Sequence, residues 1–246
     1  MLLQLSTWPE IEEFLGRSKT IVVPIGSTEQ HGPTGVLGTD WLCAEIIARE
    51  LHRRSSADIL VAPTFNVGVA QHHLGFAGSI TLRPSTFIAA ICDWASSLAH
   101  HGFERIYFLN GHGGNIASIE AAFAEFYARY SFGRERCPVV LRLGNWWKLP
   151  GVMTLANAQF PVGHGSHAEP SEIAVTQWAY PEACKHAALT PQIAADGPIR
   201  DAIDFRARYP DGRMGSDPST ASPEKGGALV QMAVEGLRHE LRAFDA

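Results

Sequence analysis

The chain has 246 residues, of which 46% are hydrophobic and 18% charged, and its formal net charge is −5. It can therefore bury the core of one α/β domain, but no run of lysine and arginine offers a surface for nucleic acid or an anionic membrane. No apolar stretch reaches the roughly 18 to 20 residues of a membrane-spanning helix, and the 4 cysteines stand far apart without paired spacing. We expect a cytoplasmic protein without a signal peptide, with reduced cysteines and a small-molecule partner.

The first predicted elements are a short helix and a buried strand. Thr7 and Glu10 have the spacing of a capping box, and Pro9 lies in the first turn, which predicts a helix there. Apolar, β-branched runs then predict strands that are covered on both faces, at 20–26, 59–65, 105–111 and 138–144. Segments with apolar residues at helical spacing predict helices at 40–54, 85–102 and 115–130, and a last helix over about 224–243.

This alternation of strands and helices predicts an α/β fold. We expect a single-domain three-layer αβα sandwich over residues 1–246, with a mainly parallel, doubly wound sheet. Segment 197–227 is rich in Gly, Pro, Ser and Asp, so it predicts loops around at most one short helix. A loop this long in a compact domain is often a lid or a subunit contact.

Residues with metal-ligand chemistry follow two of the predicted strands. Glu29 and His31 come after the first strand, Asp40 opens the next helix, and His112 lies in "NGHGGN" after the third strand. Ligands of parallel α/β sheets bind at the carboxyl ends of the strands, so these side chains are expected at one edge. Imidazole and carboxylate donors favour Zn²⁺, Mn²⁺ or Fe²⁺, and the absence of cysteine ligands argues against a structural zinc site. One carboxylate such as Asp40 could bridge two ions.

Each of these residues also has a purely structural interpretation. Asp40 is at a position where an Asp is more often a helix N-cap than a ligand. Glu29 could be a surface acid, and His31 a hydrogen-bonded turn histidine. His112 is harder to explain structurally, because the glycines on either side let the backbone approach a ligand closely.

A third cluster, "GHGSHAEPSEIAVTQW" at 163–178, precedes a helix. It carries His164, His167, Glu169 and Glu172, which could instead be helix caps or acids that favour a helix N-terminus. Ser166 lacks the Gly-x-Ser-x-Gly setting of a serine hydrolase.

Together these clusters resemble the creatininase (creatinine amidohydrolase) family. "PIGSTEQHGPTGVLGTD" is similar to the family's opening signature, and "NGHGGN" to the segment whose histidine is a ligand. The resemblance implies metal ligands at Glu29, His31, Asp40 and His112. Further similar segments are "HHLGFAGSITLRP" at 72–84, "SHAEPSEIA" around His167, and "GSDPSTASPEKGGAL" near the C-terminus.

The chain also departs from the family pattern. Creatininase has a metal-binding Glu two residues after the histidine of the third segment, where this chain has Gly114; Glu172 is our candidate for the missing ligand. Of the two tryptophans that enclose creatinine in that enzyme, the first matches Trp146 and the second falls on Gly163. These departures argue against creatinine as the substrate.

We therefore expect a metal-dependent amidohydrolase that cleaves a non-peptide C–N bond in a cyclic amide, a formamide or a similar small amide. One or two ions are expected, with zinc first and manganese or iron as alternatives. His167 and Glu172 are the expected catalytic residues, and the expected substrate contacts are His73, Gly113, Gly114 and Trp146. A metallopeptidase, a lactone hydrolase and a non-catalytic binding protein remain alternatives. The resemblance also implies a homohexamer built as a trimer of dimers.

Overall fold

A computed structural model describes residues 1–55 and 59–245, and its centre is a parallel sheet. In the described residues the sheet has four strands in the order β2-β1-β3-β4, and every pairing is parallel. The strands are β1 (Thr20–Ile25), β2 (Leu60–Val61), β3 (Arg105–Asn110) and β4 (Val140–Asn145). Ile25 lies opposite Asn110 in the β1–β3 pair, so both strands end at the same level.

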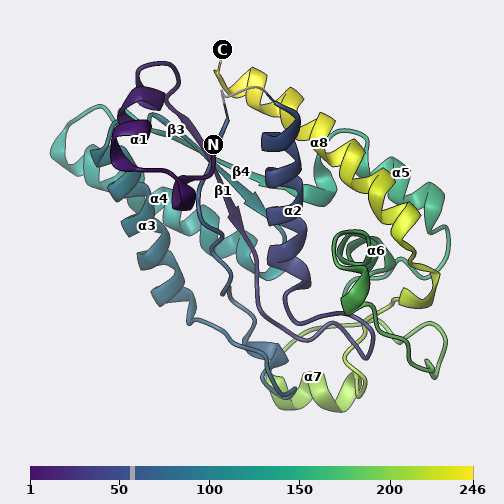
Figure 1. The fold of residues 1–246 in the computed structure, drawn as a ribbon. Helices are drawn as coiled ribbons and strands as arrows, with labels where there is room; N and C mark the ends of the chain where they lie inside the picture. Colours follow the sequence, from purple (N-terminus) through teal and green to yellow (C-terminus); the bar gives the residue numbers. More distant parts are fainter. Residues whose placement is uncertain (56–58, 246) are drawn as a thin grey trace.

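Helices cover both faces of this sheet (Figure 1). One face carries α2 (Thr39–Arg54), α5 (Val152–Gln159), α6 (Pro170–Ala179) and α8 (Pro223–Asp245). The other face carries α1 (Trp8–Leu15), α3 (Pro84–His100) and α4 (Ile116–Gly133). The predicted three-layer α/β fold with a doubly wound parallel sheet is confirmed.

The central strands β1 and β3 are mainly apolar because they contribute to two cores at once. Val22 packs in the core under α2 and α8, whereas Ile21 and Val23 pack in the core under α3 and α4. In β3, Tyr107 lies in the first of these cores and Phe108 in the second. Successive side chains of a strand point to opposite faces, so a sheet covered on both sides needs apolar residues at every position.

Two elements differ from the sequence-based expectation. The strand predicted at 59–65 is regular only at Leu60–Val61, and a single further bridge joins Ile25 to Phe65. Helix α5 had no predicted counterpart. The capping box of α1 is present, since Glu10 Oε2 accepts hydrogen bonds from the Thr7 backbone N–H and hydroxyl group.

Segment 197–227 forms one short helix, α7 (Ala202–Arg208), a single 3₁₀ turn at Pro218–Thr220 and the start of α8. Helix α7 lies beyond the carboxyl ends of the strands (Figure 1), beside the 3₁₀ turn at Gln71–His73. Of the described helices, none is both long and apolar enough to span a membrane.

The chain leaves β1 toward β2 on one side and returns to β3 on the other. The carboxyl ends of β1 and β3 are therefore the switch point of this sheet, where parallel α/β folds bind their ligands.

Candidate metal centre

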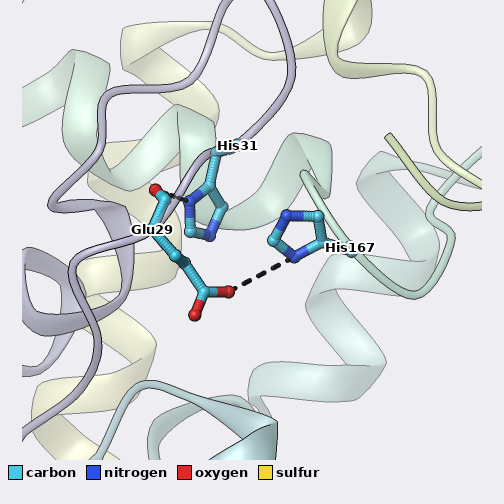
Figure 2. Close-up of side chains that lie close together, drawn as sticks. All are labelled: Glu29, His31 and His167. Carbon is cyan, nitrogen blue, oxygen red and sulfur yellow. Dashed lines mark hydrogen bonds and ion pairs between the residues drawn. The ribbon is translucent and has the colours of Figure 1, made fainter. Parts of the chain in front are cut away.

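The loop after β1 brings two predicted ligands into the protein interior. Glu29 and His31 are both 0% exposed, which excludes a surface acid. His31 Nδ1 donates to the backbone oxygen of Glu29 at 3.1 Å, so its Nε2 is left to face Asp40 Oδ1 at 3.0 Å. Figure 2 shows Glu29, His31 and His167 arranged around the same space.

Asp40 is not the N-cap of α2, because the helix begins at Thr39 and its N-cap is Gly38. Asp40 lies in the first turn and is 3% exposed, with its side chain turned inward. Its Oδ1 contacts His31, and its Oδ2 lies 3.0 Å from His112 Nδ1. A single carboxylate thus contacts histidines that follow β1 and β3.

His112 is held by the backbone at the end of β3. The side-chain amide of Asn110 accepts from the His112 N–H at 3.1 Å and donates to the His112 carbonyl oxygen. The Nε2 of His112 donates to the Val69 carbonyl oxygen at 3.1 Å, so the Nδ1 of His112 faces Asp40. A Cβ at Gly111 would lie 1.9 Å from the Asp40 carbonyl oxygen, so only glycine lets the two loops approach this closely.

Glu172 reaches the same cluster from the start of α6. It forms a capping box with Glu169, whose backbone N–H donates to Glu172 Oε1 at 2.8 Å. The same oxygen lies 3.6 Å from His31 Nε2. Gly114 offers no ligand of its own, and a Cβ there would lie 2.4 Å from His112 Nε2.

The donor atoms form three overlapping groups, each within 4.8 Å. One group is Glu29, Asp40 and His112, the second is His31, Asp40 and Glu172, and the third is Glu29, His31 and His167. Asp40 belongs to the first two groups, which is the arrangement that a carboxylate bridging two ions requires.

The charges of this cluster call for a cation. Both oxygens of Glu29 and Oδ2 of Asp40 are buried with no partner other than imidazole nitrogens 3.0 Å or more away, a costly state for carboxylates unless those rings are protonated or a cation is bound. Burial lowers the pKa of His31 and His112, but the neighbouring carboxylates outweigh it and raise these pKa values to about 10 and about 9. Either protons or metal ions can satisfy the carboxylates, and these nitrogen and oxygen donors fit divalent ions such as Zn²⁺, Mn²⁺ or Fe²⁺.

A cavity of about 320 Å³ opens over the cluster. The expected substrate contacts His73, Gly113 and Gly114 line it, together with His167. Its remaining lining includes apolar side chains from three separate segments, namely Trp147, Met153, Ile199 and Phe205.

Trp146, an expected substrate contact, does not line this cavity. Its indole is 1% exposed and packs in the core with Leu149 and Val152, whereas Trp147 lines the cavity. The reason is local: β4 ends at Asn145 and a 3₁₀ turn begins, so the two neighbouring indoles lie nearly perpendicular, at 87°.

His167 lies at the edge of the cluster, with its side chain 11% exposed. Its Nε2 donates to the backbone oxygen of Gln30 at 2.7 Å, and its Nδ1 is 3.7 Å from Glu29 Oε1. Burial lowers the pKa of His167 well below its usual value, so the ring is neutral. His164 has a structural role instead, because Ser171 and its Nε2 are hydrogen-bonded at 2.8 Å.

Besides Trp147, Met153 and Ile199, the sequence did not indicate Gln30, His72 or Phe205 as residues of the site. Gln30 stands between two ligands, where strand-like alternation points it away from them. His72 lies against His73, with ring centroids 4.1 Å apart, and Phe205 reaches the site from α7. The flanking ligands were the only sequence signal for Gln30.

Fold and site together define a protein of the creatininase class. The family model described as creatinine amidohydrolase matches residues 4–241, so the chain belongs to the creatininase family.

Named relatives differ in what they act on. The mycofactocin precursor peptide peptidase of Mycolicibacterium smegmatis is 36% identical over 108 residues, which cover 42% of this chain and 43% of the relative. The matched stretch is thus less than half the length of that relative. The creatinine amidohydrolase of Pseudomonas putida is 27% identical over 96% of this chain and 94% of its own length. A solved creatininase of Zn-Zn type has a TM-score of 0.85 at 22% identity, covering 100% of this chain and 98% of its own, and shows the same fold.

Proposed function

We propose that this protein is a metal-dependent hydrolase that cleaves a non-peptide C–N bond in a small amide, such as a cyclic amide or a formamide. Residues 1–246 would form one such amidohydrolase domain. The observation that carries the proposal is the buried cluster, in which three carboxylate oxygens of Glu29 and Asp40 have no partner other than imidazole nitrogens 3.0 Å or more away.

The geometry supports two ion positions that share one ligand. Glu29, Asp40 and His112 would hold one ion, and His31, Asp40 and Glu172 the other. Zinc is the first candidate, with manganese or iron as alternatives. Such ions lower the pKa of a bound water toward neutrality and polarise the amide carbonyl.

The protein's own residues then place and protonate the substrate. His167 has its Nε2–H engaged by a backbone carbonyl, so the unprotonated Nδ1, which faces the cluster, is the nitrogen that would accept the proton released when water adds to the amide carbonyl and then pass it to the leaving amine. Gly113 presents its backbone to the cavity without a side chain. Ile199 and Phe205 line the cavity and help to exclude bulk water from it.

A metallopeptidase is the second candidate, because the mycobacterial relatives are named as peptidases. A cavity of about 320 Å³ favours a small amide over an extended peptide. A lactone hydrolase would apply the same metal chemistry to an ester, and a non-catalytic homologue would bind a metal or small molecule without turnover. The homohexamer and the cytoplasmic location stay predictions.

The test starts with elemental analysis of protein purified without chelator, followed by a hydrolysis screen of cyclic amides, formamides, peptides and lactones. We expect one or two equivalents of a divalent metal and turnover of a small amide. His31→Ala and Asp40→Ala should lose both, whereas His101→Ala, which changes an exposed histidine after α3, should lose neither. A wild-type protein that takes up no metal even after reconstitution would refute the proposal.

A further inference from the structure

The side chain of Gln30 is fixed by two backbone groups whose hydrogen-bonding roles are unambiguous. Gln30 is 5% exposed, and its Oε1 accepts from the Gly32 N–H at 2.8 Å. Its Nε2 donates to the Gly212 carbonyl oxygen, also at 2.8 Å. A backbone N–H can only donate and a carbonyl can only accept, so these two contacts determine which way the amide is turned.

The orientation of the amide then determines the tautomer of His73. The second hydrogen of Gln30 Nε2 faces His73 Nδ1 at 2.9 Å, so this nitrogen is an acceptor. The ring therefore carries its hydrogen on Nε2, which lies 3.2 Å from Glu29 Oε1. His73 thus presents an N–H to one of the candidate ligands.

The backbone of the same residue determines the tautomer of His167. Its Nε2 lies 2.7 Å from the Gln30 carbonyl oxygen, which can only accept, so the hydrogen sits on Nε2. The amide of Gln30 is also within 3.0 Å of this nitrogen, but both amide hydrogens are already directed to His73 and Gly212. His167 Nδ1 is left with its lone pair toward Glu29.

We propose that Gln30 is a positioning residue that holds His73 and His167 in the Nε2–H tautomer and so aims Nε2–H of His73 and the free Nδ1 of His167 at Glu29. Its catalytic consequence rests on the proposed function, whereas the tautomers themselves do not.

Gly212, in the segment after α7, packs directly against the side chain of Gln30. Gly212 has a positive φ of +87°, and a Cβ there would lie 1.8 Å from Gln30 Oε1. The backbone is therefore pressed against the amide, and only glycine leaves room for the Gln30 side chain here. The long segment 197–227 thus contributes to the site through the Gly212 carbonyl as well as through Phe205.

The decisive experiment is ¹⁵N NMR of the histidine side chains in the zinc-loaded wild-type protein, whose signals report the tautomer of each ring. The signals of the two rings are assigned by their loss in His73→Gln and His167→Gln. We expect an unprotonated Nδ1 and a protonated Nε2 on His73, and a protonated Nε2 on His167. A hydrogen on Nδ1 of neutral His73 would overturn the inference, and this measurement needs no variant of Gln30 to fold.

Gln30→Glu tests the consequence, because a carboxylate offers only acceptors to His73 and to the Gly212 carbonyl. We expect kcat to fall about 10- to 100-fold with KM and zinc content nearly unchanged, and the His73 signals to leave the Nε2–H pattern. Gln71→Glu is the matched control, since it makes the same change at an exposed position close to the site, and it should alter neither kcat nor tautomers. A Gln30→Glu enzyme with wild-type kcat would refute the positioning role.

The outcome also separates the two proposals. If the wild-type protein hydrolyses no amide but shows both expected tautomers, the proposed function fails and the tautomer assignment stands. If it hydrolyses an amide with His73 in the Nδ1–H form, the function stands and the role of Gln30 fails.

Discussion

Replacing Gly114 by alanine should weaken metal binding by displacing His112. The added Cβ would lie 2.4 Å from His112 Nε2 and 2.7 Å from the Val69 carbonyl oxygen, and real Cβ contacts stay above 3.0 Å. Val69 cannot move away freely, because its N–H donates to Asn115 Oδ1 at 2.9 Å. The imidazole ring of His112 must therefore yield.

The size of the effect follows from these distances. Reaching even the 3.0 Å limit moves the ring by about 0.6 Å, whereas metal–ligand distances tolerate changes of only about 0.2 Å. The shift also disturbs the 3.0 Å contact between His112 Nδ1 and Asp40 Oδ2. We expect zinc affinity to fall at least about 10-fold, or about 1.4 kcal/mol.

The assay is zinc affinity measured by competition with a chelator, together with thermal unfolding with and without zinc. Gly113→Ala is the matched control, because it makes the same substitution one residue earlier, where an added Cβ meets nothing within 4 Å. Equal zinc affinity in the Gly114→Ala and Gly113→Ala proteins would refute the assignment of His112 as a ligand held in place by a glycine.

Three further predictions address the second ion position, the core and the pH dependence. Glu172→Gln should lower the metal content by up to one equivalent, because the amide brings no negative charge to the group around His31. Elemental analysis measures this, and an unchanged metal content would exclude Glu172 as a ligand. Phe108→Ala should lower the free energy of unfolding by about 3 to 5 kcal/mol, because Phe108 is fully buried in the core. Phe132→Ala, at a residue 90% exposed, should change it little. Equal losses of unfolding free energy in urea would contradict the burial of Phe108 in the core. Because the pKa values of His31 and His112 are raised to about 10 and about 9, their protonated rings should stabilise the metal-free protein. This contribution is complete below pH ~6.5 and is lost as the pH rises through 9 to 10. Zinc uptake at pH 7 should release protons from these rings, and calorimetry in buffers of different ionisation enthalpy that detects no release would contradict their assignment.

Local sequence patterns were sufficient for the layers of the fold and for the edge that carries the site. Apolar runs of strand length and helical periodicity depend on neighbouring residues, and they predicted β1, β3 and the two helix layers. The Glu29–His31 pair and His112 follow strands that end at the same level, so their meeting followed from the parallel order. The boundaries of β2 were not predictable in this way, because they depend on where β1 and the bridge to Leu2 stop pairing with it.

Only the tertiary structure decided the rest of the site. Which of Trp146 and Trp147 faces the cavity depends on the turn that follows β4, and neighbouring residues of the same type give no signal to separate them. The contact of Glu172 with His31 and that of Gln30 with Gly212 join residues far apart in the chain. Their distances are set by how α6 and the segment after α7 pack over the sheet edge. The sequence alone thus determined the types of donor and the edge at which they gather, whereas long-range packing determined which atoms face one another.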